Sequence, residues 1–488
     1  MKQAFHIFKK DVRYLRYEIA MTLLAATAFI FTGLRHAIMA SNAIPNQGIA
    51  WSALLIFLPI TWWFLISRVV QAESPTSRKQ FWLTRPYEWK SLLGAKVLFI
   101  ALFVNIPLLV ADVVIIQAFG FSPVREIAGL VWTQVLFTLA CVLPAAALSS
   151  IARGIGSLIT AILLGALGLL AYLIFAPWLH TGSSWFELEW VREYYVLLVV
   201  GAAALTIILW QYSGRKTAAS RALAVIAALA IWTGFSFLPW TTAFALQTQL
   251  SERRIDPSVI HIGLDLDRKW LGRVYSNVEN QMVIDLPLQI TGVPAGTELK
   301  ANGLTAVLLA PDGQVGHCQD SPPAGIDSEA GVISLQATAS NEFYAKVKDL
   351  PIRLRGTLFF TLFGNKQATD IPLEKRTVPV PGVGECAAGA HFFLCNSAFR
   401  DLSNLVSVRT FQISATRSRL PRRASYSPFP ADLRIDPIDQ FFAPQFGSVS
   451  AIVVETVRPL AYLRRDFEID NVRLGDFEMQ RLSKTSPK

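Results

Sequence analysis

The chain has 488 residues, of which 52% are hydrophobic and only 16% are charged. Soluble domains carry about 25% charged residues, so part of this chain is expected to have lipid rather than water as its solvent. Nearly all of the formal net charge of +10 lies in residues 1–244, between apolar runs. This distribution argues against a nucleic-acid-binding domain, which would gather its basic residues on one soluble face.

Residues 1–18 are predicted to form an amphipathic helix in the membrane interface. Apolar side chains recur at three- and four-residue spacing, which marks one helix face, and basic side chains occupy the rest. The apolar set is Phe5, Phe8, Val12 and Leu15, and the basic set is Lys9, Lys10, Arg13 and Arg16. This long, patterned segment favours an uncleaved anchor over a cleaved signal peptide.

Residues 19–244 are predicted to form an all-α transmembrane domain. Seven apolar runs approach the roughly 20 residues that a transmembrane helix needs. They are Ile19–Leu34, Gly48–Ile66, Val97–Phe119, Ile127–Ile151, Ile155–Ala176, Tyr195–Trp210 and Ala222–Phe244. With the N-terminus in the cytoplasm, the inside segments hold 15 Lys and Arg residues and the outside loops hold three. The positive-inside rule therefore predicts that everything after the seventh run is extracytoplasmic.

The loop at residues 67–96 is the most distinctive stretch of this half, because it is long, basic and aromatic. A proline inside it disfavours helix in the residue before it. Exposed aromatic residues beside basic ones are typical of a docking surface, but they also suit side chains that rest on lipid headgroups. Both interpretations stay open for this set: Glu73, Phe81, Trp82, Arg85, Pro86 and Trp89.

A family resemblance is carried by this loop, in particular by Glu73, Phe81-Trp82-Leu83-Thr84-Arg85-Pro86 and Leu92-Leu93-Gly94-Ala95-Lys96. Together with the N-terminal helix and the bundle, it resembles the permease subunits of bacterial ATP-binding-cassette exporters of the type-2 class. The resemblance implies that Glu73–Trp89 is a coupling helix seated on a separate ATPase subunit. It also implies a homodimer or a sister permease as partner, and location in the bacterial inner membrane. The chain departs from the family in its seventh span and in its large C-terminal domain.

The chain is not expected to be an enzyme, and no cofactor is expected on it. It has no Gly-x-x-x-x-Gly-Lys-Ser/Thr loop, so ATP must bind to a partner subunit. Among the polar residues within the apolar runs, the candidates for a functional role are Asn105, Asp112 and Gln134. They either line a substrate or proton path or form hydrogen bonds between neighbouring helices.

Residues 245–482 are predicted to form a mainly β extracytoplasmic domain, most simply an antiparallel sandwich. Alternating apolar residues from Met282 to Ile290 show strand periodicity, and several short strand-like segments follow at turn-bounded intervals. Cys386 and Cys395 either form a local disulfide or are both free. No metal-type histidine spacing is present, so the domain is interpreted as a binding or assembly module. Residues 483–488 are expected to be a disordered tail.

These observations lead to a ranked set of hypotheses. The first is a permease subunit that moves an unidentified substrate with a separate ATPase, while the β-domain contacts cargo or an envelope protein. The second is a membrane-anchored receptor or scaffold that does not transport and whose β-domain binds an envelope ligand. A membrane enzyme with an external site is the third, and no catalytic constellation supports it.

Overall fold

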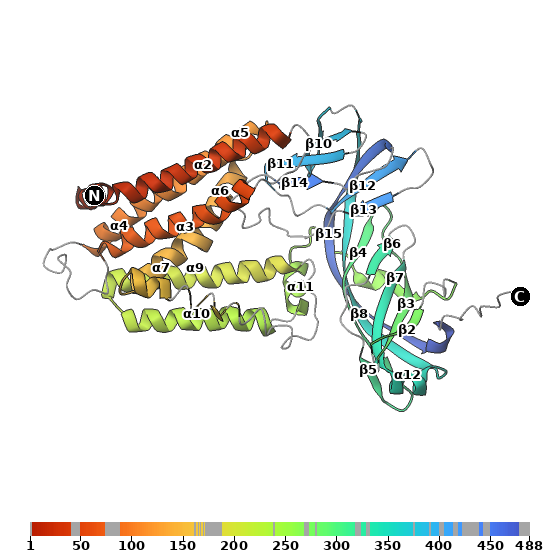
Figure 1. The fold of residues 1–488 in the computed structure, drawn as a ribbon. Coiled ribbons are helices and arrows are strands. Elements are labelled where there is room, and N and C mark those ends of the chain that lie inside the picture. Colours follow the sequence, from red (N-terminus) through yellow and green to blue (C-terminus); the bar gives the residue numbers. More distant parts are fainter. Residues whose placement is uncertain are drawn as a thin grey trace, which may run out of the picture.

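The computed structural model describes 2–40, 49–73, 88–160, 188–237, 240–267, 273–278, 281–317, 324–327, 332–373, 376–389, 392–399, 405–412, 418–421, 439–442 and 449–477, with isolated residues between 163 and 170. A helical bundle forms the N-terminal half and β-sheets form the C-terminal half (Figure 1). The helices run side by side, with the N-terminus at one end of the bundle and the β-domain at the other.

The bundle is built from nine α-helices and two π-helical segments within the described residues. They are α1 (Lys2–Tyr14), α2 (Arg16–Ala40), α3 (Ile49–Gln71), α4 (Trp89–Ile100), η2 (Ala101–Asn105), α5 (Ile106–Ala118), α6 (Ile127–Phe137), η3 (Thr138–Val142), α7 (Leu143–Ile151), α9 (Glu189–Gly214) and α10 (Thr217–Phe237), followed by the short α11 (Trp240–Thr248). Segments α4–η2–α5 and α6–η3–α7 each make one continuous crossing.

Six of these helical stretches are long and apolar enough to cross a membrane, as expected for a multi-pass membrane protein. The expected fifth span, Ile155–Ala176, lies largely outside the described residues. Of the residues that flank this stretch, Ile151 at the end of α7 accepts a hydrogen bond from Arg221, and Leu188 packs in an apolar cluster with residues of β8 and β15.

The expected last span, Ala222–Phe244, differs in its extent from the structure. Helix α10 ends at Phe237, and the short helix α11 begins at Trp240. The sequence places Pro239 between them. Proline cannot donate the backbone hydrogen bond that a continuing helix needs and disfavours helical geometry in the preceding residue. The crossing therefore lies further toward the N-terminus than expected.

The two π-helical segments have a common cause. Each is followed at the second position of the next helix by a proline, Pro107 after η2 and Pro144 after η3. A proline inside a span removes a backbone donor and clashes with the carbonyl four residues earlier. In both places the residue before the proline instead bonds to the carbonyl five residues back, Ile106 to Ala101 and Leu143 to Thr138.

The β-domain contains three antiparallel sheets. One has the order β1-β3-β7-β6, with β2 beside β3: β1 (His261–Leu264), β2 (Arg273–Val278), β3 (Gln281–Thr291), β6 (Ala324–Asp327) and β7 (Val332–Ser340). The second has the order β14-β11-β10-β9: β9 (Val378–Val380), β10 (Gly384–Gly389), β11 (Phe392–Ser397) and β14 (Asp439–Phe442). The third is β13-β12-β15-β8-β4-β5: β4 (Glu298–Leu309), β5 (Val315–His317), β8 (Ile352–Ile371), β12 (Leu405–Gln412), β13 (Ser418–Pro421) and β15 (Val449–Val472).

The long strands β8 and β15 are shared by two hydrophobic cores. The first core lies between the β3–β7 sheet and one half of these strands, and includes Leu358 and Leu463. The second lies between the β10–β11 sheet and their other half, and includes Ile371 and Ile452. Register shifts interrupt the β8–β15 pairing on either side of Pro459, between the two halves. The expected sandwich is thus two sandwiches on one central sheet.

The β-domain is joined to the bundle at the junction between the two sandwiches. Trp190 of α9 and Phe244 of α11 share an apolar cluster with Phe359 of β8 and Tyr462 of β15. The segment after α11 continues this contact, because Arg253 N donates to Leu460 O at 2.9 Å. These bonds attach the last helix directly to strand β15.

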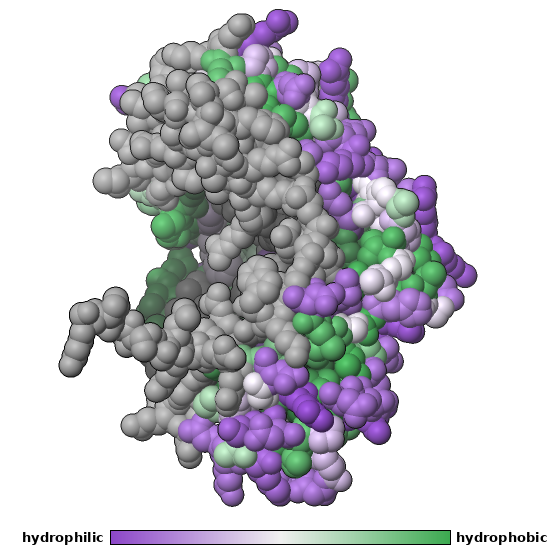
Figure 2. Space-filling view, turned by 90° about the vertical axis from the view of Figure 1, so that its right-hand side faces the viewer, coloured by the Kyte–Doolittle hydropathy of each residue, from purple (hydrophilic) through white to green (hydrophobic). Residues whose placement is uncertain are grey.

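The face of the β-domain turned away from the helices differs from the helix surfaces. Figure 2 shows mainly hydrophilic residues over the described part of that face, with scattered hydrophobic ones. The helices instead expose large apolar side chains such as Leu24, Phe31 and Leu198. This contrast is what a lipid-facing bundle and a water-facing domain require.

Candidate functional site

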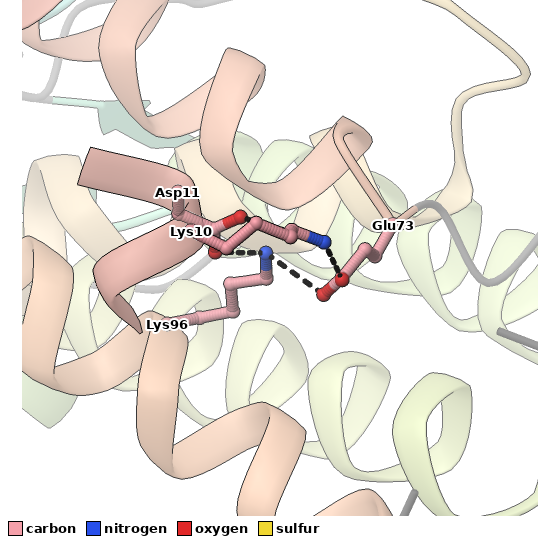
Figure 3. A network of polar contacts seen from close by, with 4 residues as sticks. All are labelled: Lys10, Asp11, Glu73 and Lys96. Atoms are coloured by element: carbon pink, nitrogen blue, oxygen red, sulfur yellow. Dashed lines mark hydrogen bonds and ion pairs between the residues drawn. The ribbon is translucent and has the colours of Figure 1, made fainter. Parts of the chain in front are cut away.

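A cluster of four charged side chains lies at the end of the bundle that is remote from the β-domain (Figure 3). Lys96 Nζ donates to Asp11 Oδ2 at 2.7 Å and lies 3.2 Å from Glu73 Oε2. Lys10 Nζ donates to the other oxygen of Glu73 and lies 4.0 Å from Asp11 Oδ1. Two carboxylates and two ammonium groups therefore alternate, and their formal charges cancel.

Three of the four side chains are buried. Asp11, Lys96 and Glu73 are 0%, 2% and 5% exposed, whereas the side chain of Lys10 is half exposed. Charged groups are almost never fully buried unless they are paired. Removing one of the three buried members would leave an uncompensated buried charge, so each of them depends on an oppositely charged neighbour.

Helix packing brings these residues together from distant parts of the sequence. Asp11 lies on the buried face of α1, four residues from both Ile7 and Leu15. Lys96 lies on the buried face of α4, in line with Leu92 and Phe99. The ring of Phe8 lies 6.3 Å from that of Phe99, which adds apolar contact between α1 and α4. Glu73 follows the end of α3 and closes the cluster.

The two carboxyl groups respond differently to this environment. Burial raises the pKa of the Asp11 carboxyl above its ordinary value of 3.8, and the Lys96 charge offsets only part of that effect. Burial also acts to raise the pKa of Glu73, but Lys96 and Lys10 together outweigh it and hold that pKa below its ordinary value of 4.5. The two carboxyl groups of the cluster therefore shift in opposite directions.

A tyrosine of a further crossing completes the surroundings of the cluster. Tyr212 of α9 is buried and lies close enough to Glu73 and Asp11 to experience the charge of both. Its hydroxyl has no hydrogen-bond partner in the part of the chain that the structure describes. The cluster thus joins α1, α4 and the residue that follows α3, and its charges reach Tyr212 of α9.

The described residues that flank the predicted coupling loop belong to the cluster or to the helix that carries one of its members. Residues 74–87 lie outside the described residues, and so do Phe81, Trp82, Arg85 and Pro86. Glu73 immediately before the loop is held in the cluster, and α4, which carries Lys96, starts at Trp89 immediately after it. Trp89 is 36% exposed, and Lys90 lies over its ring at 5.8 Å. Both ends of the loop are therefore fixed to α1 through ion pairs.

The N-terminal helix is amphipathic, with one difference from the expected apolar face. Lys9, Lys10, Arg13 and Arg16 are exposed, Phe8 and Val12 are half-buried and Leu15 is buried, but Phe5 is 60% exposed. The face that packs against the bundle passes through Ile7, Asp11 and Leu15. The contact of α1 with α4 therefore includes the buried carboxylate of Asp11. The side chains of Phe5 and Tyr14 are exposed, as suits contact with lipid.

Two of the predicted polar residues within the spans, Asn105 and Gln134, are joined by a hydrogen bond. Asn105 Nδ2 donates to Gln134 Oε1 at 3.3 Å and to Thr138 Oγ1 at 3.0 Å. Asp112, on α5, is fully buried. Asn105 of η2 thus bonds to Gln134 of α6 and to Thr138 of η3, and the second of these bonds connects the two π-helical segments.

The two cysteines of the β-domain face each other across adjacent strands. Cys386 of β10 pairs in register with Cys395 of β11, and the structure joins them by a disulfide. Both are buried in the core of the second sandwich. Cys141 is the free cysteine of the described residues, and it accepts a hydrogen bond from Trp63 Nε1 at 3.2 Å.

Sequence reasoning missed Asp11 and Lys96 as partners. Each carried a signal that a single sequence could have offered. An acid four residues from Ile7 and Leu15 lies on an apolar helix face, and Lys96 lies within an apolar run. An isolated charge would be energetically costly at either position, so a charge of one sign there predicts a nearby partner of the opposite sign.

No group of three or more His, Cys, Asp or Glu residues suited to a metal occurs among the described residues. The ion pairs of the charged cluster join α1 to α4 and to Glu73 at the end of α3. No family model and no curated protein matches the chain.

Proposed function

We propose that the chain is the permease subunit of an ATP-driven exporter, acted on by a separate ATPase at its N-terminal end and located in the bacterial inner membrane. The observation that carries this proposal is the buried ion cluster. It attaches both ends of loop 74–87 to α1 and to the crossing that starts with α4. A push on that loop would be passed to these helices rather than absorbed by a flexible connection.

Two further observations support the orientation. Arg221 and Ile151 lie at the same end of the bundle as the ion cluster, together with the basic segments around residues 153 and 215–216. The β-domain lies at the opposite end. Cytoplasmic loops carry an excess of Lys and Arg, so this arrangement supports a cytoplasmic N-terminus and an extracytoplasmic β-domain.

Copurification tests the ATPase assignment. The ATPase encoded nearest to this chain would be tagged and captured in mild detergent with wild-type chain or with the variants Trp82→Ala, Arg85→Ala and Trp89→Ala. We expect each substitution to reduce capture, because loop side chains provide the contact. Arg464→Ala in the β-domain is the matched control, since its ion pair with Asp466 is exposed and far from the loop. Unchanged capture of all three loop variants would exclude the coupling role.

A receptor or scaffold function is the alternative, and one observation favours it. The β-domain rests directly on the helices through Trp190, Phe244, Phe359 and Tyr462, as a ligand-binding domain of a signalling protein would. A receptor would keep its function in a strain that lacks the ATPase, whereas a permease subunit would lose it. The phenotype of the ATPase deletion compared with that of the chain's own deletion therefore separates the two.

A further inference from the structure

Two neighbouring crossings change their helical geometry where they touch. Segment η2 interrupts the α4–α5 crossing and η3 interrupts the α6–α7 crossing, and each precedes a proline. Asn105, the last residue of η2, donates to Thr138, the first residue of η3. The two interruptions therefore face each other and are tied by one side chain. π-Helical turns of this kind are local departures that often lie at functional positions.

The helices on one side of the interruptions are held firmly. Lys96 fixes α4 to α1 through Asp11. Ser149 of α7 donates to Ser67 of α3 at 2.9 Å, and both side chains are buried. The two parts nearest the ion cluster, α4 and α7, are thus each bonded to a neighbouring helix by buried polar groups.

The helices on the other side carry a contact with the β-domain. A Cβ atom added to Gly129 of α6 would lie 2.4 Å from the ring of Phe399, so the ring occupies the place of a side chain there. Ala398, next to it and directly after β11, belongs to the apolar core of the bundle. The second sandwich therefore rests on the α5–α6 end of these crossings, beyond the interruptions.

We propose that η2 and η3 form a paired hinge within the membrane. Bending there moves the α5–α6 hairpin, together with the second sandwich that rests on Gly129, relative to α4 and α7. Asn105 keeps the two hinges in step, because its amide is bonded to both Gln134 and Thr138. The hinge describes how the bundle and the outer domain move and does not depend on which partner drives the movement.

Two other features of the surface give weaker grounds for a proposal than η2 and η3 do. The groove of about 550 Å³ beside β5 and α12 (Asn341–Val347) is lined by exposed polar residues such as Glu342 and Lys346. Lys346 is already paired with Asp312. The exposed apolar face of α10 suits lipid as well as protein. Segments η2 and η3 instead combine a π-helical backbone, a following proline that explains it, and a hydrogen bond from Asn105 that joins the two segments.

Distance measurements between spin labels test the hinge in the full chain in lipid nanodiscs. Cys141 and Cys318 would be replaced by Ala and Ser, respectively. Labels would be attached to Val131→Cys in α6 and Leu148→Cys in α7, which lie on either side of η3. The control pair, at a similar spacing in the sequence, is Leu198→Cys and Ser213→Cys, along the uninterrupted helix α9. We expect a broader distance distribution for the first pair than for the control.

Two further sets of substitutions should change the width of the distance distribution in opposite directions. Pro107→Ala with Pro144→Ala restores the missing backbone donors and should narrow the distribution of the first pair. Asn105→Leu removes the tie and should broaden it. The proposal is overturned if the two pairs have equal widths, or if neither set of substitutions changes the first pair. Monodisperse elution of each variant establishes that it is folded, and the control pair reports any general loosening.

Discussion

The amino group of Lys96 and the carboxylate of Asp11, 85 positions apart in the chain, lie 2.7 Å apart at a site closed to water. Asp11 belongs to the N-terminal helix α1, and Lys96 belongs to α4, the first part of the third apolar crossing. Ion pairs of this kind are weak evidence of stability when compared with an apolar pair, but breaking one is expensive. The site is therefore best tested by removing its members singly and together.

Lys96→Met should lower the free energy of unfolding by about 3–5 kcal/mol, because it leaves two buried carboxylates without their shared cation. The double variant Asp11→Asn with Lys96→Met should recover part of this loss, since one of the stranded charges is also removed. Thermal unfolding of the detergent-solubilised chain, followed by tryptophan fluorescence, measures both. If the double variant is no more stable than Lys96→Met, the two residues do not act as a pair.

Glu73 gives the cluster a defined dependence on pH. Its pKa in the folded chain lies below the ordinary value of 4.5, so the stability it contributes is present above that value and is lost as the pH falls through the folded pKa. The unfolding midpoints of wild type and Glu73→Gln should differ at neutral pH and converge as the medium is acidified below about 4.5. A difference that stays constant with pH would contradict this role.

The contact between Gly129 and Phe399 predicts a compensating pair of substitutions. Gly129→Ala places a methyl group where the ring lies and should destabilise the chain by about 1–3 kcal/mol. Phe399→Ala in the same chain opens space for that methyl group. A double-mutant cycle of unfolding midpoints should therefore show strong coupling between the two positions. Additive effects would mean that the ring and the helix do not touch.

The disulfide predicts how the β-domain responds to reduction. In a chain with Cys318→Ser, alkylation of acid-quenched, denatured cell protein should leave Cys386 and Cys395 unmodified until a reductant is added, if the domain folds in an oxidising compartment; denaturation is needed because both sulfurs are buried. Replacing both by Ser should cost about 2–4 kcal/mol. Mass spectrometry of the alkylated chain reads out the first result, and urea unfolding of the detergent-solubilised chain the second. Modification without reductant would place the domain in a reducing compartment.

Much of the fold could be predicted from the sequence where the pattern is local. The span Ile127–Ile151 has the bounds expected from its apolar run, and the alternation from Met282 to Ile290 lies within β3. The full lengths of β8 and β15 could not be predicted, because each strand faces two cores and the alternation changes between them. Strand pairing joins segments about a hundred residues apart, and a single sequence does not show such pairing.

The candidate site was harder to predict from the sequence, because its residues also come from distant segments of the chain. The basic residues of α1 were interpreted as facing lipid headgroups, and four of them are exposed as that requires. Asp11 contributes to the site only through Lys96, and helix periodicity in one segment does not identify its partner in another. The prolines after η2 and η3 were visible, but their effect depends on the neighbouring crossing that Asn105 reaches.

Strands β8 and β15 belong to both sandwiches of the β-domain at once. Neither half can lose its order while these two strands remain paired along their whole length. An amino-acid change that loosens the ribbon near Pro459 would therefore weaken two separate hydrophobic interiors and the seat of the helices in a single event. Substitutions in the flanking sheets would disturb one hydrophobic interior, whereas substitutions in β8 or β15 would disturb both.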